Sequence, residues 1–98
     1  MWYFVEPHQK ILRQFYTDLE SKLIADSVGR VMFQRGALTF TELETILFYQ
    51  REPTKSAQFL LDLLKECPVR DVYDVFMESL KETQQNDVFS LLFTGGWI

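Results

Sequence analysis

His8 and Cys67 are the residues of this chain whose side chains best suit covalent chemistry. A cysteine thiolate is a strong nucleophile, and a histidine beside it can act as the base that takes its proton. Such a pair also needs a third group to orient the imidazole, and no recognisable pattern supplies one. We therefore expect no enzyme. His8 should be solvated in the first helical turn, and Cys67 should pack as a small apolar residue or remain a free surface thiol.

Cys67 is the only cysteine, which limits both cross-links and metal binding. One cysteine forms no disulfide within its chain and builds no cysteine-based metal cage. The sequence therefore predicts no metal, no cofactor and a reducing compartment, the cytoplasm. The apolar run over residues 1–5 stops at Glu6 and Pro7, so it is too short for a signal peptide or a membrane span.

Charged side chains could bind a partner of opposite charge, and in this chain the acidic ones predominate. Fourteen Asp and Glu residues against ten Lys and Arg residues give a formal net charge of −4. A protein that neutralises phosphates needs the opposite sign, so nucleic acid is a poor candidate partner. A helical DNA- or RNA-binding module remains the rival from another class of function, but no basic recognition helix supports it.

Length and composition indicate a single domain over residues 1–98. The chain is 47% hydrophobic and contains nine phenylalanines. This is enough apolar surface to offset the chain entropy lost on folding, in a chain of about the length of one domain.

Helical periodicity in the first half of the chain predicts three helices, over about 8–22, 25–35 and 39–50. Gly36 ends the second of these helices, and the spacing from Thr39 to Glu42 is that of a capping box that starts the third. The apolar stripes are Leu12, Phe15, Tyr16 and Leu19, then Ile24, Val28, Val31 and Met32, then Leu43, Ile46 and Leu47.

Three more helices are expected in the second half, over about 55–66 and 69–82 and in a short segment that Asn86 caps and Gly95 ends. Thr54 is expected to cap the first of them, which should be the central helix. Their stripes are Ala57, Leu60, Leu61 and Leu64, then Val69, Val72, Tyr73, Phe76, Met77 and Leu80, then Val88, Leu91 and Leu92. Aromatic and methionine side chains at this spacing indicate core, not a ligand site. No segment alternates with period two, so the sequence predicts an all-α, six-helix antiparallel bundle.

Three segments also share features with one known family. Residues 19–39 end a helix with a basic residue and glycine before Leu-Thr, 51–64 contain Arg-Glu-Pro-Thr and Leu-Leu-Asp-Leu-Leu, and 72–83 end in Glu-Thr. With Leu91 and Leu92, this order resembles caspase recruitment domains over about residues 8–93. The resemblance implies the death fold, a six-helix bundle of Greek-key topology. The chain departs from the pattern in its Trp2-Tyr3-Phe4 lead, at Gly29 and at Glu66-Cys67-Pro68.

The resemblance also implies a function. Family members are adaptor modules that bind like domains, recruiting a caspase or linking it to a sensor in apoptotic or inflammatory signalling in innate immunity. The expected partners are therefore a caspase, adaptor or sensor that carries such a domain, or further copies of this chain, with no nucleic acid and no membrane. The alternative within the family is a decoy that carries only this domain and caps growing assemblies.

Family members commonly bind through a basic surface on helices one and four and an acidic surface on helices two and three. We define the basic face as Lys10, Arg13, Arg51 and Lys55, and the acidic face as Asp26, Glu42 and Glu44. Because one molecule offers both faces, the contact would be heterologous and could propagate into a helical filament. The alternative is an ordinary solvated surface, which also mixes signs.

The terminal aromatic residues and Gly29 each allow two interpretations. Trp2, Tyr3, Phe4 and Trp97 lie outside the periodic segments, and they either fold back as a lid or mark where neighbouring sequence was removed. Gly29 is either slack within its helix or allows a neighbouring helix to approach closely.

Overall fold

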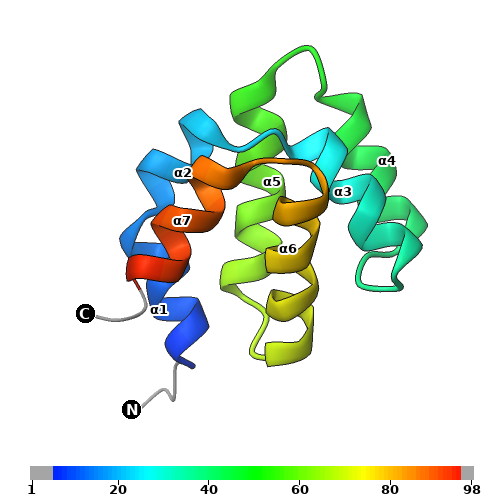
Figure 1. The fold of residues 1–98 in the computed structure, drawn as a ribbon. Helices are drawn as coiled ribbons and strands as arrows, with labels where there is room; N and C mark the ends of the chain where they lie inside the picture. Colours follow the sequence, from blue (N-terminus) through cyan, green and yellow to red (C-terminus); the bar gives the residue numbers. More distant parts are fainter. Residues whose placement is uncertain (1–5, 96–98) are drawn as a thin grey trace, which may run out of the picture.

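The computed structural model describes residues 6–95, and the regular elements in this range are all helices (Figure 1). The all-α prediction is confirmed. Trp2, Tyr3, Phe4 and Trp97 lie outside the described residues. The helices are α1 (Pro7–Gln14), α2 (Tyr16–Lys22), α3 (Ala25–Gln34), α4 (Phe40–Phe48), α5 (Pro53–Lys65), α6 (Arg70–Glu82) and α7 (Asn86–Gly95).

The single helix expected over 8–22 is divided into α1 and α2, so that prediction was wrong and the described helices number seven instead of six. Phe15 ends α1 and begins α2, with φ −103° and ψ 14°. The apolar stripe continues across this break, since Leu12 and Leu19 are both fully buried. Both halves pack against α5. The spacing of buried residues is therefore the same on both sides of Phe15, and it does not indicate that the helix is broken there.

Local signals account for three helix ends, and at two of them, Gly36 and Thr39, the sequence predicts the end. Pro7 is the first residue of α1, where its missing N–H costs nothing. At the start of α4, the Glu42 amide donates to Thr39 Oγ1 at 3.1 Å, and the Thr39 amide donates to Glu42 Oε1 at 2.9 Å. This is the expected capping box. After α3, Gly36 has a φ of 80°, the left-handed conformation that glycine adopts without strain.

Two other expected caps were wrong. Helix α5 begins at Pro53 and not after a Thr54 cap, so Thr54 lies inside the first turn. Proline suits the first helical position because its fixed φ is already helical. Asn86 is the first residue of α7 and not its cap. The residue before it, Gln85, points its side chain at Ile24 instead.

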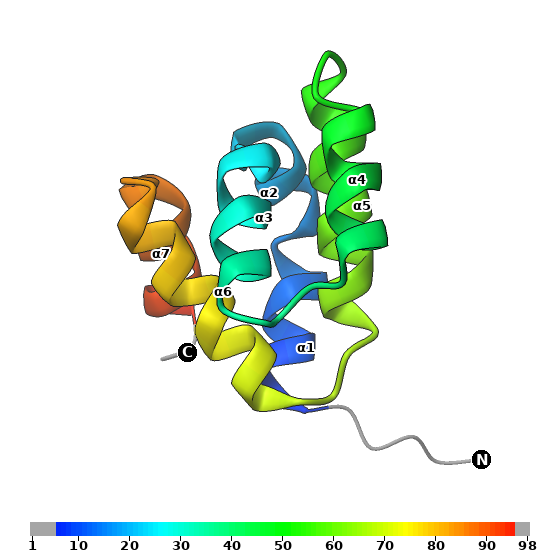
Figure 2. The same ribbon diagram turned by 90° about the vertical axis from the view of Figure 1, so that its right-hand side faces the viewer.

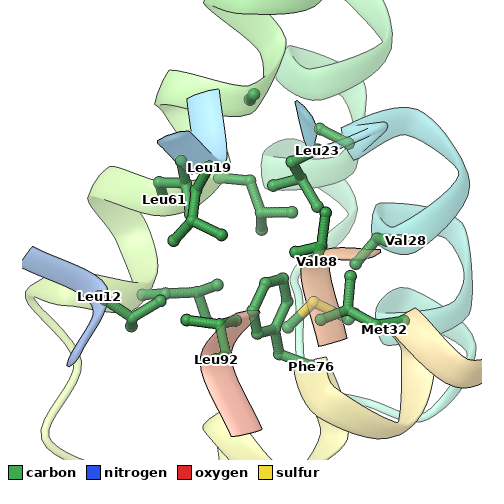
Figure 3. Packing of buried hydrophobic residues seen from close by; sticks show 14 of the residues in the cluster. Leu12, Leu19, Leu23, Val28, Met32, Leu61, Phe76, Val88 and Leu92 are labelled. Atoms are coloured by element: carbon green, nitrogen blue, oxygen red, sulfur yellow. The ribbon is translucent and has the colours of Figure 1, made fainter. Parts of the chain in front are cut away.

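Helix α5 is the central helix, as expected, and packs against α1, α2, α3 and α4. Its Leu60 and Leu61 are fully buried. Figure 3 shows the core around Leu61. Side chains from the other helices pack in the same core cluster, among them Leu12, Leu19, Met32, Phe76, Val88 and Leu92.

Gly29 marks a close approach of two helices, which decides between the two readings of this residue. A Cβ atom added at Gly29 would lie 3.1 Å from Cδ1 of Ile46 on α4. The glycine therefore lets α3 and α4 pack closely. The expected core residues Tyr73 and Phe76 are buried, and Met77 is partly buried against the same core.

Candidate functional site

Lys10 and Arg13 are the part of the basic face that lies on α1, and both are exposed. The start of α1 is fixed to the C-terminal end of α5, because Nε2 of Gln9 donates to the Lys65 carbonyl at 2.9 Å. The α1 cations therefore belong to the end of the molecule where α5 finishes. Lys65 adds a further cation there, although its Nζ lies 3.4 Å from Asp62.

Arg51 and Lys55 are exposed at the opposite end of α5. At a rise of 1.5 Å per residue, Lys55 and Lys65 are about 15 Å apart along the helix axis. Lys55 is also paired with Glu52, with 3.1 Å between Nζ and the carboxylate. The structure thus divides the basic face into two separate pairs of cations.

The surface between these two pairs is polar but not basic. Tyr16 donates its hydroxyl to Asp62 at 2.9 Å, and Gln58 donates to Glu20 at 2.9 Å. These contacts join α2 to α5 and place two carboxylates between the cation pairs. A partner that binds both pairs would therefore have to accommodate negative charge between them.

The acidic face is also spread out. Helices α3 and α4 run antiparallel, since Phe33 near the end of α3 contacts Phe40 at the start of α4, and Gly29 earlier on α3 lies against Ile46 later on α4. Asp26, in the first turn of α3, and Glu42, in the first turn of α4, therefore lie toward opposite ends of the pair.

The three acidic residues differ in how free they are to bind a partner. The carboxylate of Glu42 is occupied in the capping box, and Asp26 is half-buried. Glu44 is exposed and takes part in no ion pair among the described residues. Glu44 is thus the most available carboxylate of the acidic face.

The α1 cations and the α4 carboxylates lie on different sides of the bundle. Helix α5 packs against both α1 and α4 and lies between them (Figure 1). Opposite charges on different sides cannot neutralise one another within one molecule. They can attract another molecule on each side.

His8 is buried, with 1% of its surface exposed, so the expectation of a solvated histidine was wrong. Its Nε2 lies 3.1 Å from the backbone carbonyl oxygen of Cys67. The structure therefore brings together the two residues considered for catalysis, but through the main chain and not through the thiol. Cys67 is a free, partly exposed cysteine, and the His8 Nδ1 atom has no hydrogen-bond partner in the described part of the chain.

Gln9 caps the C-terminal end of α5 and His8 binds the turn that follows it, which accounts for the burial of both side chains. The last carbonyls of a helix lack partners within the helix and must find them elsewhere. His8 contacts the Cys67 carbonyl and Gln9 donates to that of Lys65, while Oε1 of Gln9 accepts from the Glu6 amide at 3.0 Å. Sequence periodicity missed this role, because it depends on which helix end lies beside α1.

The two tyrosines with shifted pKa values are poor acids. Burial, together with the hydrogen bond to Asp62 and its charge, raises the pKa of Tyr16 to about 12. Burial raises the pKa of Tyr73 to about 12 as well. Both phenols therefore stay protonated at neutral pH and offer no phenolate for chemistry.

Arg35 joins α3 to α6 through a contact that helical periodicity does not predict. Its guanidinium contacts the carboxylates of Glu78 and Glu82. These two glutamates are four residues apart on α6, so they lie on one helix face. That spacing is the sequence signal that could have indicated a cation-binding pair.

Exposed aromatic residues on α4 and a groove beside α7 were also missed. Phe40 and Phe48 are 61% and 80% exposed. The groove has a volume of about 550 Å³ and lies between α1, α6 and α7. Phe40 and Phe48 are eight residues apart, the spacing of one helix face, and this spacing is the sequence signal that could indicate the outward stripe.

Neither a metal centre nor a membrane span is visible in residues 6–95. No group of three or more His, Cys, Asp or Glu residues in that range is placed to hold a metal ion. No helix of the same range has both the length and the apolar character needed to cross a bilayer. In comparisons with known proteins, no family model, curated protein or solved structure matches this chain.

Proposed function

We propose that this chain is an adaptor module of the caspase-recruitment type, which binds like domains in apoptotic or inflammatory signalling in the cytoplasm. One observation carries the proposal: exposed cations on α1 and an exposed carboxylate on α4, which has no ion pair within residues 6–95, lie on different sides of one small helical bundle. The resemblance of the sequence to caspase recruitment domains supplies the pathway and the class of partner.

The same resemblance supports a death fold with Greek-key topology. Helices α1 and α2 together fill the span of one helix of the expected six, since they are separated only by Phe15. The remaining five helices lie close to the expected ranges. Counting α1 and α2 as one bent helix gives the six-helix pattern that the resemblance implies.

A binding role without catalysis is supported by the residues best suited to chemistry. The imidazole of His8 contacts a main-chain carbonyl and not the Cys67 thiol. The phenols of Tyr16 and Tyr73 remain protonated. Each of these groups therefore stabilises the fold instead of presenting a reactive atom to a substrate.

Binding would proceed by charge complementarity between unlike sides of two domains. Lys10 and Arg13 of one domain would face carboxylates of the next, and Glu44 would face cations of a third. Such pairs raise the association rate and fix orientation, and salt weakens them. Because the two sides of the contact differ, assembly would be heterologous and open-ended.

The test is binding of the purified chain to a panel of caspase recruitment domains, measured by pull-down and by titration. Arg13→Glu and Glu44→Lys should each weaken binding by about tenfold or more, because each turns an attraction into a repulsion. The matched controls are Lys22→Glu on α2 and Asp71→Lys on α6, which make the same charge changes at exposed positions outside both faces.

Circular dichroism should show that all four variants are folded. Equal binding by the variants and the controls would contradict the assigned residues. Absence of binding by the wild-type chain to every domain of the panel would contradict the proposed function itself.

A further inference from the structure

Helix α4 is apolar on two faces, and the rest of the bundle covers only one of them. Leu43 and Ile46 point inward and are buried. Phe40, Glu44 and Phe48 follow at intervals of four residues, so they share a second, outward face. Phe40 and Phe48 are 61% and 80% exposed. We call these three residues the α4 stripe.

A stripe of this kind is the pattern by which an amphipathic helix docks into an apolar groove of a partner. Single exposed apolar residues are common on protein surfaces, but two phenylalanines about 12 Å apart in line on one helix give that helix a second apolar face. Phe33 extends it, because its ring contacts that of Phe40. The acidic group at the middle of the stripe adds a requirement for a cation on the partner.

The groove between α1, α6 and α7 has the matching chemistry. Its apolar lining includes Ile11, Met77, Phe89 and Leu92. Its volume of about 550 Å³ is in the range that holds a drug-sized molecule, so it is large enough for aromatic side chains. We call this feature the α6–α7 groove.

The rim of the α6–α7 groove supplies the cation. Lys81 lies at the rim, with its Nζ 5.0 Å from the centroid of the Phe89 ring. It has no ion-pair partner among the residues that the structure describes, whereas Arg70, the other rim cation, is held by Asp74 at 3.1 Å. Lys81 is therefore the cation that remains available to a carboxylate.

We propose that the α4 stripe of one copy of this chain docks into the α6–α7 groove of a second copy, with Glu44 against Lys81. The two surfaces complement each other in apolar character and in charge. They cannot meet within one molecule, because α4 and α7 lie on opposite sides of the bundle in both views (Figures 1 and 2). Each copy thus offers one stripe and one groove, and the contact is heterologous.

This contact extends the proposed function; it shares Glu44 with the charge-complementary contact but otherwise rests on different residues. The charge-complementary contact uses Lys10 and Arg13 on α1, whereas the new one uses Phe40, Phe48 and the groove. The two contacts also respond differently to salt. Screening weakens exposed charge pairs, but an apolar contact persists at about 0.5 M salt.

The first experiment is analytical ultracentrifugation of the full chain over a range of concentrations in high salt. Wild type should self-associate. Phe48→Ser removes the stripe and Met77→Lys blocks the groove, and each variant alone should associate about 30-fold more weakly. An equimolar mixture of the two should form 1:1 dimers and nothing larger, because only one intact stripe and one intact groove remain.

The matched control is Ile24→Ser, which removes an exposed apolar side chain (55% exposed) away from both surfaces. It should associate like wild type. Circular dichroism checks that each variant is folded. Monomeric wild type throughout the concentration range, or a mixture that stays monomeric, would overturn the proposal.

A charge swap tests the pairing of Glu44 with Lys81 in low salt. Glu44→Lys and Lys81→Glu should each weaken self-association, and the double variant should recover most of the wild-type affinity. A double variant that is as weak as either single variant would show that these residues do not meet. Loss of binding to other caspase recruitment domains, with self-association intact, would count against the proposed function and leave this contact standing.

Discussion

Gln85 ties two distant parts of the chain together with one buried side chain. Its Oε1 accepts from the Ile24 amide at 2.8 Å, and its Nε2 donates to the Ile24 carbonyl at 3.1 Å. The side chain of the residue just before α7 therefore forms hydrogen bonds with the backbone N–H and C=O groups of the residue just before α3. A glutamine amide suits this position because it both donates and accepts.

Replacing Gln85 with alanine should lower the free energy of unfolding by about 1–3 kcal/mol, because two partly buried backbone groups would lose their partner. Urea denaturation followed by circular dichroism measures the effect. Gln84→Ala is the control, since Gln84 is exposed and directly precedes Gln85. Equal effects of the two substitutions would show that the Ile24 contacts contribute nothing.

Tyr73 should make the stability of the protein fall at high pH. Its pKa is raised from 10.0 to about 12 by burial, so the folded state holds a proton that the unfolded state releases. The stabilisation is complete below pH 10 and is lost as the pH rises toward 12. Wild type should lose of the order of 2 kcal/mol over that interval through this group.

Tyr73→Phe should reduce this loss, because phenylalanine has no proton to release. The measurement is the free energy of unfolding of both proteins at a series of pH values from 8 to 11.5 or so. The same slope in both proteins would show that Tyr73 does not titrate differently in the folded state.

At the scale of helices, Gly29 controls how closely α3 and α4 pack. A valine at this position would place methyl groups where the Ile46 side chain lies, since even a Cβ atom would be 3.1 Å from its Cδ1. Gly29→Val should therefore destabilise the fold by about 1–3 kcal/mol through overpacking.

Arg30→Val is the matched control for Gly29→Val. It makes a β-branched residue at the adjacent exposed position of the same helix, where the cost is limited to helix propensity, about 0.5 kcal/mol. Thermal unfolding of both variants gives the comparison. A smaller effect at Gly29 than at Arg30 would contradict the close approach.

Helix positions were largely predictable because burial follows the period of the helix. The ranges expected for α3, α5 and α6 agree with the structure to within two residues. The capping box at Thr39 was predictable because both of its bonds are local. The break at Phe15 was not, since the apolar side chains on both sides of it face the same core.

The candidate binding residues could be named from the sequence, but their arrangement could not. Whether Arg13 and Lys55 are neighbours depends on the direction in which α1 crosses α5, and that direction is fixed by contacts such as Gln9 to Lys65. Helical periodicity describes each helix alone. It contains no information on which ends of two helices lie together, so it cannot predict a surface formed by several helices.

At the scale of the whole molecule, α7 closes the bundle by packing against α1, α2 and α6. Its Val88 and Leu92 are 2% and 1% exposed and lie in the central cluster (Figure 3). Small domains are stable by only about 5–15 kcal/mol, and each large-to-small change at such a site costs about 1–5 kcal/mol. The packing of this one helix thus accounts for a substantial part of the free energy of unfolding.

The double variant Val88→Ala and Leu92→Ala should therefore lose most of its stability and melt at a much lower temperature, or without a cooperative transition. Scanning calorimetry is the measurement. The control replaces Asp87 and Ser90 with alanine, because these α7 residues are exposed. Equal melting temperatures for the two double variants would contradict the closing role of α7.

The capping of α5 by α1 has a consequence for the newly made protein. Gln9 and Lys65 are 56 residues apart, so at about 5–20 residues per second the ribosome needs several seconds to make the second after the first. An isolated helix as short as the eight residues of α1 is unstable in water. We expect nascent chains that end before residue 67 to be cut readily by protease within α1, and longer released chains to resist. Helix α1 is made before α5 and is thus completed late, and its apolar face is available to chaperones in the meantime.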